Sequence, residues 1–483
     1  MNQTGNTPQP DGMRQQTSFT AYLMGSALVA ALGGLLFGFD TAVISGAEQR
    51  LQELFQPMSG MGGGARAFWH GFLVAGALIG TIVGAVAVGK PADIFGRRAT
   101  MFGLAALYFV SAVGSAFAWD WYSFVIFRFI GGLGVGGASV VSPMYIAEIS
   151  PAPVRGRLVA LAQFNIVLGI LIAFLSNYII GLLQLGDVEW RWMFGVEAFP
   201  AAVYFLLLFM TPRSPRWLLA MKRENEARAV LTRVGSRNVE TEIKAIKESL
   251  DIERHNLQEP FFQKKYMTPI LLAIMIAAFN QLSGINAILY YSKRIFESAG
   301  FGASASLLNS VGLGAVNLIF TMAALTVIDR FGRKKLMIVG SIGYILSLGA
   351  TALAFYTQSH LVQGDGGAFV REISQTGGWV VFISLLVFIA SHAFGQGAVI
   401  WVFISEVFPT RVRARGQALG SFTHWIFAAA ISQTFPLIAE VSGGHIFAFY
   451  CVCMVGQLLW VLFYMPETKG ISLEEIQKRL HIE

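Results

Sequence analysis

The sequence predicts an all-α membrane protein with twelve transmembrane helices in two six-helix halves, joined by an intracellular helical linker. Three observations predict this fold class. Hydrophobic residues make up 55% of the chain and charged residues only 13%, which excludes a soluble domain with a charged surface. Twelve apolar stretches of about 20 residues follow one another, each long enough to cross about 30 Å of hydrocarbon. Motifs of the first six stretches recur in the last six.

The apolar stretches are separated by polar connections. In order, they are Ser18–Gly46, Phe68–Gly89, Thr100–Ala118, Trp121–Tyr145, Leu158–Leu183, Trp192–Met210, Thr268–Tyr291, Ser306–Ile328, Leu336–Tyr356, Trp379–Ile404, Gly416–Ile438 and Ile446–Met465. The polar start of the chain has no basic segment followed by a short apolar core, so a cleaved signal peptide is not expected.

These stretches divide the chain into an N-terminal half (1–210), a linker (211–267), a C-terminal half (268–465) and a tail (466–483). Charged, heptad-like stretches at Glu224–Thr232 and Val239–Arg254 predict short amphipathic helices in the linker. Most of the 35 Lys and Arg residues lie on one side of the membrane if the N-terminus is cytoplasmic. Both termini are therefore expected in the cytoplasm, and the net charge of +7 reflects topology rather than nucleic-acid binding.

The repeated motifs indicate that the two halves arose by duplication. Acidic and basic residues recur at the ends of equivalent spans: Asp93 and Arg97 match Asp329 and Arg333, and Glu148 and Arg155 match Glu406 and Arg413. Asp40 in the first span occupies the position of Asn286 in the seventh. A transporter built in this way holds its substrate between the halves near the midplane.

Asp40 is the most informative residue, because it lies inside an uncharged run that is long enough to span a bilayer. A carboxylate there costs about 2.5–3.5 kcal/mol on insertion scales and marks an ion or proton pathway. Arg128, inside the fourth span, needs an anion at that depth, and Asp40 is the natural partner. Protonation of Asp40 would break such a pair and loosen the contact between two helices. The alternative is a pair that only packs helices together.

These motifs resemble the sugar porter family of the major facilitator superfamily, over nearly the whole chain. The sequence is most similar to bacterial sugar–proton symporters in its first half and to animal glucose facilitators in parts of its pocket. The shared signatures are Gly38-Phe39-Asp40-Thr41-Ala42-Val43-Ile44-Ser45-Gly46, Arg128 with Gly131-Gly132-x-Gly134, Pro212-Arg213-Ser214-Pro215-Arg216-Trp217-Leu218, Gln281-Leu282-Ser283-Gly284-Ile285-Asn286 with Tyr290-Tyr291, and Pro466-Glu467-Thr468-Lys469-Gly470.

The resemblance implies roles for individual residues. Proton symporters of the family carry Asp at the position of Asp40, whereas passive facilitators carry Asn, and Glu197 is also found in proton-coupled relatives. The matching sugar-contact positions are Gln163, Ile170, Asn280, Gln281, Asn286, Asn317, Trp401, His424 and Trp425. Tyr290 and Tyr291 are expected near the extracellular gate. The repeated charges, Asp93, Arg97, Glu148, Arg155, Asp329, Arg333, Glu406 and Arg413, are expected to form a cytoplasmic network that holds the outward-facing state.

Physical chemistry supports a sugar pocket at these positions, because amides donate to and accept from hydroxyls and aromatic rings pack on the apolar face of a pyranose. On a straight helix, Gln281 and Asn286 diverge by about 140°. We therefore expect a break at Ser283-Gly284 that turns both inward.

Four positions depart from the family pattern. Asn280 lies at a position where relatives carry Gln, and His424 at one where they often carry Gln or Asn. Arg213 replaces a Glu of the linker motif. Ile170 replaces the Gln of xylose symporters, as in glucose facilitators, and favours a hexose over a pentose.

The sequence thus predicts a proton-coupled monosaccharide symporter of the bacterial inner membrane, functional as a monomer. A passive sugar uniporter and a membrane sugar sensor are the alternatives. No enzymatic activity, cofactor, metal site or nucleic-acid partner is expected. His70 is expected at the membrane interface, His392 as a satisfied core histidine, and Cys451 and Cys453 as reduced packing residues.

Overall fold

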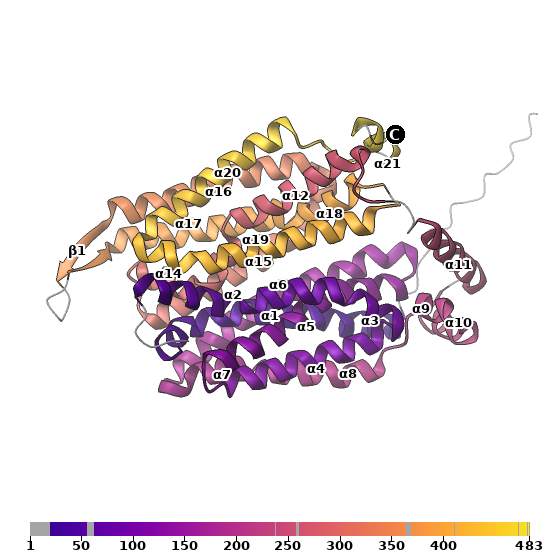
Figure 1. The fold of residues 1–483 in the computed structure, drawn as a ribbon, viewed down its shortest axis with the longest axis horizontal. Helices are drawn as coiled ribbons and strands as arrows, with labels where there is room; N and C mark the ends of the chain where they lie inside the picture. The colour runs from indigo at the N-terminus through magenta and orange to yellow at the C-terminus, as the bar shows by residue number, and fades with distance from the viewer. Residues whose placement is uncertain are drawn as a thin grey trace, which may run out of the picture.

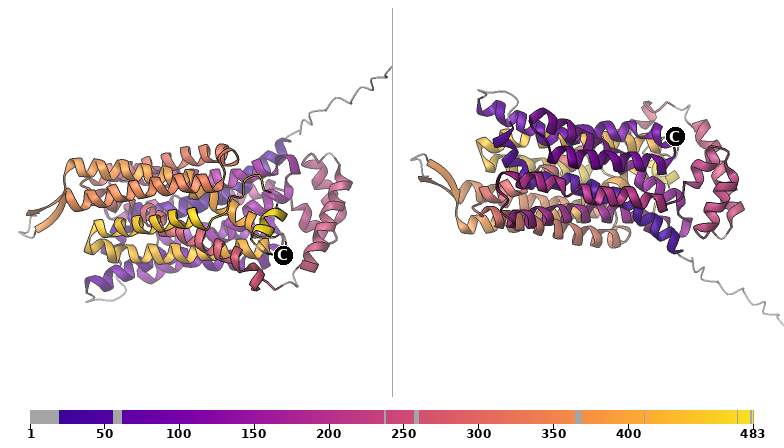
Figure 2. Two further views of the ribbon diagram at one scale, coloured as in Figure 1. Left: turned by 90° about the horizontal axis from the view of Figure 1, so that it is seen from above. Right: turned by 90° about the horizontal axis from the view of Figure 1, so that it is seen from below.

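The computed structural model describes all residues except 1–19, 56–61, 237, 257–259, 364–368, 410, 472, 481 and 483. Long helices run in the same or opposite directions through an elongated bundle (Figure 1). Three linker helices pack at one end of this bundle, and a short β-hairpin projects from the other (Figure 2). These are called the linker end and the hairpin end below.

The N-terminal half contains six spans, of which the sixth is broken. Its elements are α1 (Ala21–Leu54), α2 (Gly63–Ala87), α3 (Gly89–Ile94), α4 (Arg97–Ala116), α5 (Trp121–Ile149), α6 (Ala152–Leu182), η1 (Gly186–Val188), α7 (Glu189–Gly195), α8 (Ala198–Leu207) and η2 (Leu208–Met210). The predicted start of the first span, Ser18, lies outside the described residues.

The linker and the C-terminal half follow. The linker forms α9 (Pro215–Ala220), α10 (Glu224–Arg233) and α11 (Val239–Asn256). The C-terminal half and the tail contain η3 (Lys264–Tyr266), α12 (Met267–Leu282), α13 (Ile285–Tyr290), α14 (Ser292–Ser298), α15 (Ala303–Phe331), α16 (Arg333–Thr357), β1 (Ser359–Gln363), β2 (Phe369–Ile373), α17 (Gln375–Phe394), α18 (Gln396–Val407), α19 (Arg413–Val441), α20 (Gly443–Phe463) and α21 (Leu473–Arg479).

The predicted all-α class with twelve spans is confirmed. Within the described residues, eleven segments are long and apolar enough to cross a membrane. The twelfth, α19, is 29 residues long but carries polar side chains such as His424 and Gln433 inside its apolar stretch. The sequence did not predict the hairpin, in which β1 pairs antiparallel with β2 and Ser359 lies opposite Ile373.

The two amphipathic helices predicted in the linker are α10 and α11. Ala227, Leu231 and Ile243 turn inward and pack with Trp217 of α9. The outer surface carries ion pairs, including Lys247 with Glu224 at 2.6 Å. The hydrogen bond from Lys247 holds the pKa of the Glu224 carboxyl below its ordinary value. The linker is therefore a small folded unit rather than an extended connection.

Close helix packing explains many of the glycines. A Cβ atom at Gly38 of α1 would lie 1.9 Å from the carbonyl oxygen of Ile166 on α6, and one at Gly132 of α5 would lie 1.9 Å from that of Ala77 on α2. Backbones in direct contact need residues without a side chain, as is usual for helices in membranes. Gly132, in the Gly-rich stretch 131–137 of α5, thus serves close helix packing.

Contacts between the two halves gather at the hairpin end. There α2 packs on α19, and α6 packs on α15. A Cβ atom at Gly71 of α2 would lie 2.1 Å from the carbonyl oxygen of Gln433 on α19, and one at Gly181 of α6 would lie 2.6 Å from Leu307 on α15. The halves are therefore closed against each other at this end.

Candidate functional site

The predicted partner of Arg128 is Asp40. The Nη1 atom of Arg128 lies 2.5 Å from Oδ1 of Asp40, and Nη2 donates to the Asp40 backbone carbonyl at 3.0 Å. Both side chains are no more than 3% exposed. The ion pair joins α1 to α5 in the interior of the N-terminal half.

The surroundings of this pair keep water away from it. The ring centroid of Phe194 lies 5.4 Å from the Arg128 guanidinium carbon. A Cβ atom at Gly131 would lie 3.3 Å from Asp40 Oδ1 and only 2.3 Å from Ser111 Oγ, so a larger residue there would clash with Ser111 and crowd the pair. Arg128 Nε has no hydrogen-bond partner among the described residues. The carboxylate of Asp40 is therefore the group that compensates this buried charge.

Glu197 is the second buried carboxyl beside the pair. It lies between α7 and α8, where the sixth span is broken, and is 1% exposed. Its Oε1 atom has no hydrogen-bond partner among the described residues, and it interacts electrostatically with Asp40 and Arg128. Two carboxyls and one guanidinium are neutral together when one carboxyl carries a proton. The sequence-based assignment of Glu197 to this group thus fits its position.

The helix break expected at Ser283-Gly284 is present. Gly284 has φ +85° and separates α12 from α13. This turns Asn286 back towards Gln281, so that Asn286 Nδ2 donates to Gln281 Oε1 at 3.0 Å. Gln281 Nε2 donates to Asn280 Oδ1 at 3.0 Å and lies 3.1 Å from His424 Nε2. Four polar side chains from α12, α13 and α19 thus converge in one cluster, which we call the amide cluster.

An aromatic wall lies against the amide cluster. The ring centroids of Trp401 and His424 are 5.2 Å apart, and those of His424 and Trp425 are 4.8 Å apart. Trp425 in turn contacts Phe37 of α1, with ring centroids 5.6 Å apart. Trp401 is 38% exposed, whereas Trp425 is 5% exposed. The wall therefore reaches from an accessible surface of the C-terminal half to α1, one helical turn before Asp40.

Other predicted sugar positions lie on neighbouring helices. Asn317 of α15 is buried and accepts a hydrogen bond from Thr321 at 3.4 Å. On α6, Gln163 is half-buried and Ile170 is buried. Phe37, which joins the wall to α1, was missed from the sequence because an aromatic residue in an apolar span carries no local signal.

The predicted gate tyrosines are both buried. Tyr290 ends α13, and Tyr291 follows it. The ring of Tyr291 stacks on Phe435 of α19 at 4.6 Å between centroids, and its hydroxyl donates to the Ser432 carbonyl at 3.1 Å. Tyr291 therefore belongs to the contact between α19 and the seventh span at the hairpin end.

The repeated charges form one network at the linker end of each half. In the first half, Arg97 contacts both Asp93 and Glu148 at 3.0 Å. In the second, Arg333 contacts Glu406 at 2.8 Å, whereas the side chain of Asp329 lies outside the described part of the chain. Each Arg thus binds the Glu at the end of a neighbouring span within its own half.

Two hydroxyls complete these networks in the same manner. Ser214 of the linker donates to Glu148 at 2.5 Å, and Thr468 of the tail donates to Glu406 at 2.6 Å. Arg155 and Arg413 also match, since each donates from Nε to the backbone carbonyl five residues earlier, at 3.3 and 3.4 Å. The linker and tail signatures thus hold equivalent positions in the two halves.

Arg213 of the linker motif lies 3.7 Å from Glu226 of α10. It therefore finds an acidic neighbour within the linker.

Two polar groups were not recognised from the sequence. The first lies in the C-terminal half, where Tyr344 bonds to His392 Nδ1 at 2.6 Å, which satisfies His392 as expected. Gln396 and Gln457 bond to each other beside it.

The second lies at the hairpin end, where His70 bonds to Glu48 at 2.8 Å and is 4% exposed. The expectation of an interfacial His70 is therefore wrong. Its partner was missed because the predicted first span stopped at Gly46, whereas α1 continues to Leu54.

Comparison with known proteins places this chain in a family. The family model described as "Sugar (and other) transporter" matches residues 26–480. The chain belongs to this family. It is 35% identical to the D-xylose-proton symporter of Escherichia coli K12, over 95% of this chain and 96% of that one. It is also 35% identical to the glucose transport protein of Synechocystis, over 96% and 98% of the two chains.

A solved structure described as the partially occluded inward open conformation of the xylose transporter XylE from E. coli is similar throughout. It aligns with a TM-score of 0.81 and 35% identity, covering 94% of this chain and all of that one. The chain is therefore a multi-pass membrane protein of a sugar transporter family, and the twelve-helix fold in two halves is that of its relatives.

The Asp40–Arg128 pair predicts a measurable coupling in stability. Asp40→Asn should leave the buried guanidinium without the anion bonded to it and destabilise the protein by about 3–5 kcal/mol. Arg128→Met should destabilise the protein comparably, because it leaves the buried Asp40 carboxyl without its cation. The double variant should lose much less than the sum, and thermal unfolding of all four proteins in detergent measures this. Losses that simply add would contradict the pairing.

Proposed function

We propose that this protein is a proton-coupled monosaccharide symporter of a bacterial inner membrane and works by alternating access. The observation that carries the proposal is the buried pair of Asp40 and Arg128, one helical turn from the aromatic wall beside the amide cluster. A titratable group thus lies next to a site suited to hydroxyls and to the apolar face of a pyranose. The xylose–proton symporter among its relatives supports the same reading.

Protonation of Asp40 is the coupling step in this proposal. The proton removes the negative charge that holds Arg128, so the contact between α1 and α5 weakens. Phe37 on α1 touches Trp425 of the C-terminal half, so a movement of α1 reaches the sugar site directly. At a membrane potential of about 100 mV, each proton supplies roughly 2.3 kcal/mol, which is enough to concentrate sugar about fifty-fold.

The orientation proposed places the linker end in the cytoplasm. Its support is the clustering of Lys and Arg in the segments that lie there, including α9 to α11. With this orientation, the halves are closed on the outside, and the structure corresponds to an inward-facing state. The similarity to an inward-open xylose transporter supports that assignment.

The sugar proposed is a hexose such as glucose. Ile170 is buried on α6 and offers an apolar surface rather than an amide. Without an amide at that position a ring hydroxyl has no hydrogen-bond partner there, and the apolar side chain suits contact with the exocyclic carbon of a hexose. Relatives named for xylose and for glucose both occur, so the pocket rather than the family determines the choice.

The first test is uptake by proteoliposomes that contain either wild type or Asp40→Asn. Asn has the size of a protonated carboxyl, so sugar counterflow should persist while proton-driven accumulation disappears. Glu226→Gln, an exposed linker change, serves as the matched control and should accumulate sugar normally. Accumulation by Asp40→Asn at the wild-type level would place coupling elsewhere. Wild-type exchange without accumulation would indicate a passive uniporter.

The second test concerns the sugar site. Gln281→Ala should raise the dissociation constant for glucose about ten-fold, or roughly 1.4 kcal/mol, because one hydrogen bond is lost in a site shielded from water. Gln375→Ala, an exposed glutamine at the start of α17, should bind as the wild type does. Calorimetry measures both, with xylose as competitor. Wild-type affinity in Gln281→Ala, or a clear preference for xylose, would overturn the respective assignment.

The third test concerns the charge networks, which we propose close the linker end in the outward-facing state. Glu148→Gln should weaken the hold on Arg97 and Ser214 and increase the inward-open population at least two-fold. Spin-label distances between Gly156 and Lys335, exposed at the linker end of the two halves, measure this. If Glu148→Gln and the wild type show the same populations, Glu148 does not help to close the linker end.

A further inference from the structure

Three side chains meet in a buried cluster at the hairpin end, about 12 Å along α1 from Asp40 at 1.5 Å per residue. Glu48 of α1 is fully buried. Arg294 of α14 donates from Nε to its Oε1 at 2.8 Å and from Nη2 to its Oε2 at 2.7 Å. His70 of α2 lies on the same Oε2, with its Nε2 at 2.8 Å. We call this cluster the outer latch.

The latch crosses the boundary between the halves. Glu48 and His70 belong to the N-terminal half, whereas Arg294 comes from the C-terminal half. Arg294 also donates to Gln52, one helical turn beyond Glu48 on α1. The halves cannot separate at the hairpin end while Arg294 holds two side chains of α1. A bidentate pair with a buried carboxylate is among the strongest side-chain contacts available for this purpose.

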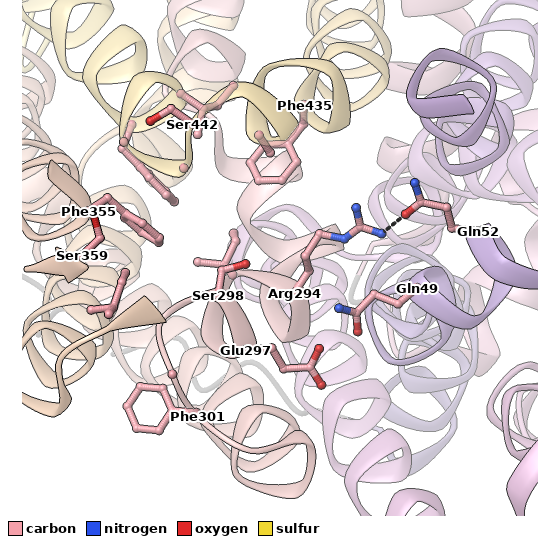
Figure 3. A pocket seen from close by; sticks show the side chains of 18 of the residues that line it. Gln49, Gln52, Arg294, Glu297, Ser298, Phe301, Phe355, Ser359, Phe435 and Ser442 are labelled. Atoms are coloured by element: carbon pink, nitrogen blue, oxygen red, sulfur yellow. Dashed lines mark hydrogen bonds between the residues drawn. The ribbon is translucent and has the colours of Figure 1, made fainter. Parts of the chain in front are cut away.

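A large pocket at the hairpin end borders the latch on the side of Arg294. Its volume is about 1370 Å³, and Gln49, Gln52 and Arg294 form part of its lining. Figure 3 shows Arg294 reaching across towards Gln52, with Phe435 beside it and Glu297 and Ser298 from the same helix around it. Ser359, Phe355 and Ser442 line the side of the pocket opposite Gln52 (Figure 3). Water and protons in this pocket therefore reach the face of the latch that Arg294 covers.

The geometry makes the latch sensitive to protons, and an added proton weakens it. With neutral His70, the cluster contains one carboxylate and one guanidinium and carries no net charge. Protonated His70 would put two cations on the single oxygen Oε2, and a repulsion between like charges a few ångströms apart is strong in a buried site. Protonated Glu48 would lose the ion pair instead. Either proton weakens the hold on Arg294.

Other groups around His70 do not reverse this effect, in which protonation weakens the hold on Arg294. Arg66, one turn earlier on α2, lines the pocket together with Glu53 and Glu297. Tyr291 faces the His70 ring at 6.3 Å between centroids, and Phe435 of α19 lies behind Tyr291. From α19, the backbone carbonyls of Ser432 and Gln433 complete this side. Glu48 is thus the carboxylate in contact with His70, and Arg294 is the group that a second positive charge displaces.

We propose that Glu48, His70 and Arg294 form a proton-sensitive latch that closes the outer entrance and that acid in the external medium releases it. The proposal rests on the orientation given above, with the hairpin end outside. Acid outside then favours the state that receives a sugar and a proton from that side. The latch acts before the proton reaches Asp40, and it controls access rather than coupling.

The experiment measures the outer entrance directly, without transport. Cys451→Ser and Cys453→Ser remove the native thiols, and nitroxides are placed at Leu183 of the N-terminal half and Ser304 of the C-terminal half, both exposed at the hairpin end. Double electron–electron resonance compares pH 7.5 with pH 5.5. The wild type should gain at least three-fold in the long-distance, outward-open population at pH 5.5.

Variants identify the groups responsible. His70→Gln keeps a hydrogen-bond donor but does not titrate, so its response to pH should fall to less than half of the wild-type response. His445→Gln changes a histidine at the same end, bonded to Tyr356 outside the latch, and should respond as the wild type does. Glu48→Gln and Arg294→Gln both remove the ion pair and should be open at both pH values. Either of these suffices if the other does not fold.

The same measurement in an Asp40→Asn background separates this proposal from the proposed function. The latch response should persist there, because the outer cluster does not involve Asp40. A response that disappears with Asp40 would assign the pH effect to the coupling site and overturn the latch. A wild type without any pH response, or a full response in His70→Gln, would overturn it as well. Failure of sugar accumulation with an intact latch response would instead contradict only the symport proposal.

Discussion

The ion pair between Asp40 and Arg128 is the constraint on which the rest of this protein depends. A guanidinium and a carboxylate buried among apolar helices are tolerated only together, since each would otherwise carry an uncompensated charge in a medium of low dielectric constant. The packing of α1 is arranged around this need. Gly38 lets α1 lie against the backbone of α6, and Gly131 leaves room on α5 for the carboxylate. A residue that can accept a proton is thereby part of the contact that joins α1 to α5.

The duplicated halves share a scaffold and differ in their chemistry. Gly96 and Gly332 both have φ +89° and both begin the helix that carries the network arginine, Arg97 or Arg333. A side chain at either glycine would clash, with Trp217 in one half and with Glu467 in the other. By contrast, the first span carries the charged Asp40, and the seventh carries Asn286 at the matching position. One half therefore holds the titratable group, and the other holds the neutral amides.

Sequence reasoning succeeded where the signal is local. Apolar length predicted the twelve spans, and a buried Arg128 predicted an anionic partner that the structure identifies as Asp40. The divergence of Gln281 and Asn286 on a straight helix predicted the break at Gly284. What it missed depends on distant contacts. Glu48 and Arg294 lie in different halves, beyond the apolar part of their spans, and only the folded structure brings them to 2.7 Å. Phe37 was missed for the same reason.

Both titratable clusters lie on one helix, and in the mechanism proposed above this orders the events at its two ends. α1 is a continuous helix of 34 residues that carries Asp40 in its interior and Glu48 near its outer end. A helix held near one end can pivot about that point, but the held end cannot move away from its partner. While Arg294 holds Glu48, a proton on Asp40 weakens the contact with α5 but leaves α1 tied to the C-terminal half at the hairpin end. The outer cluster must therefore release α1 before the charge state of Asp40 can be converted into opening on that side.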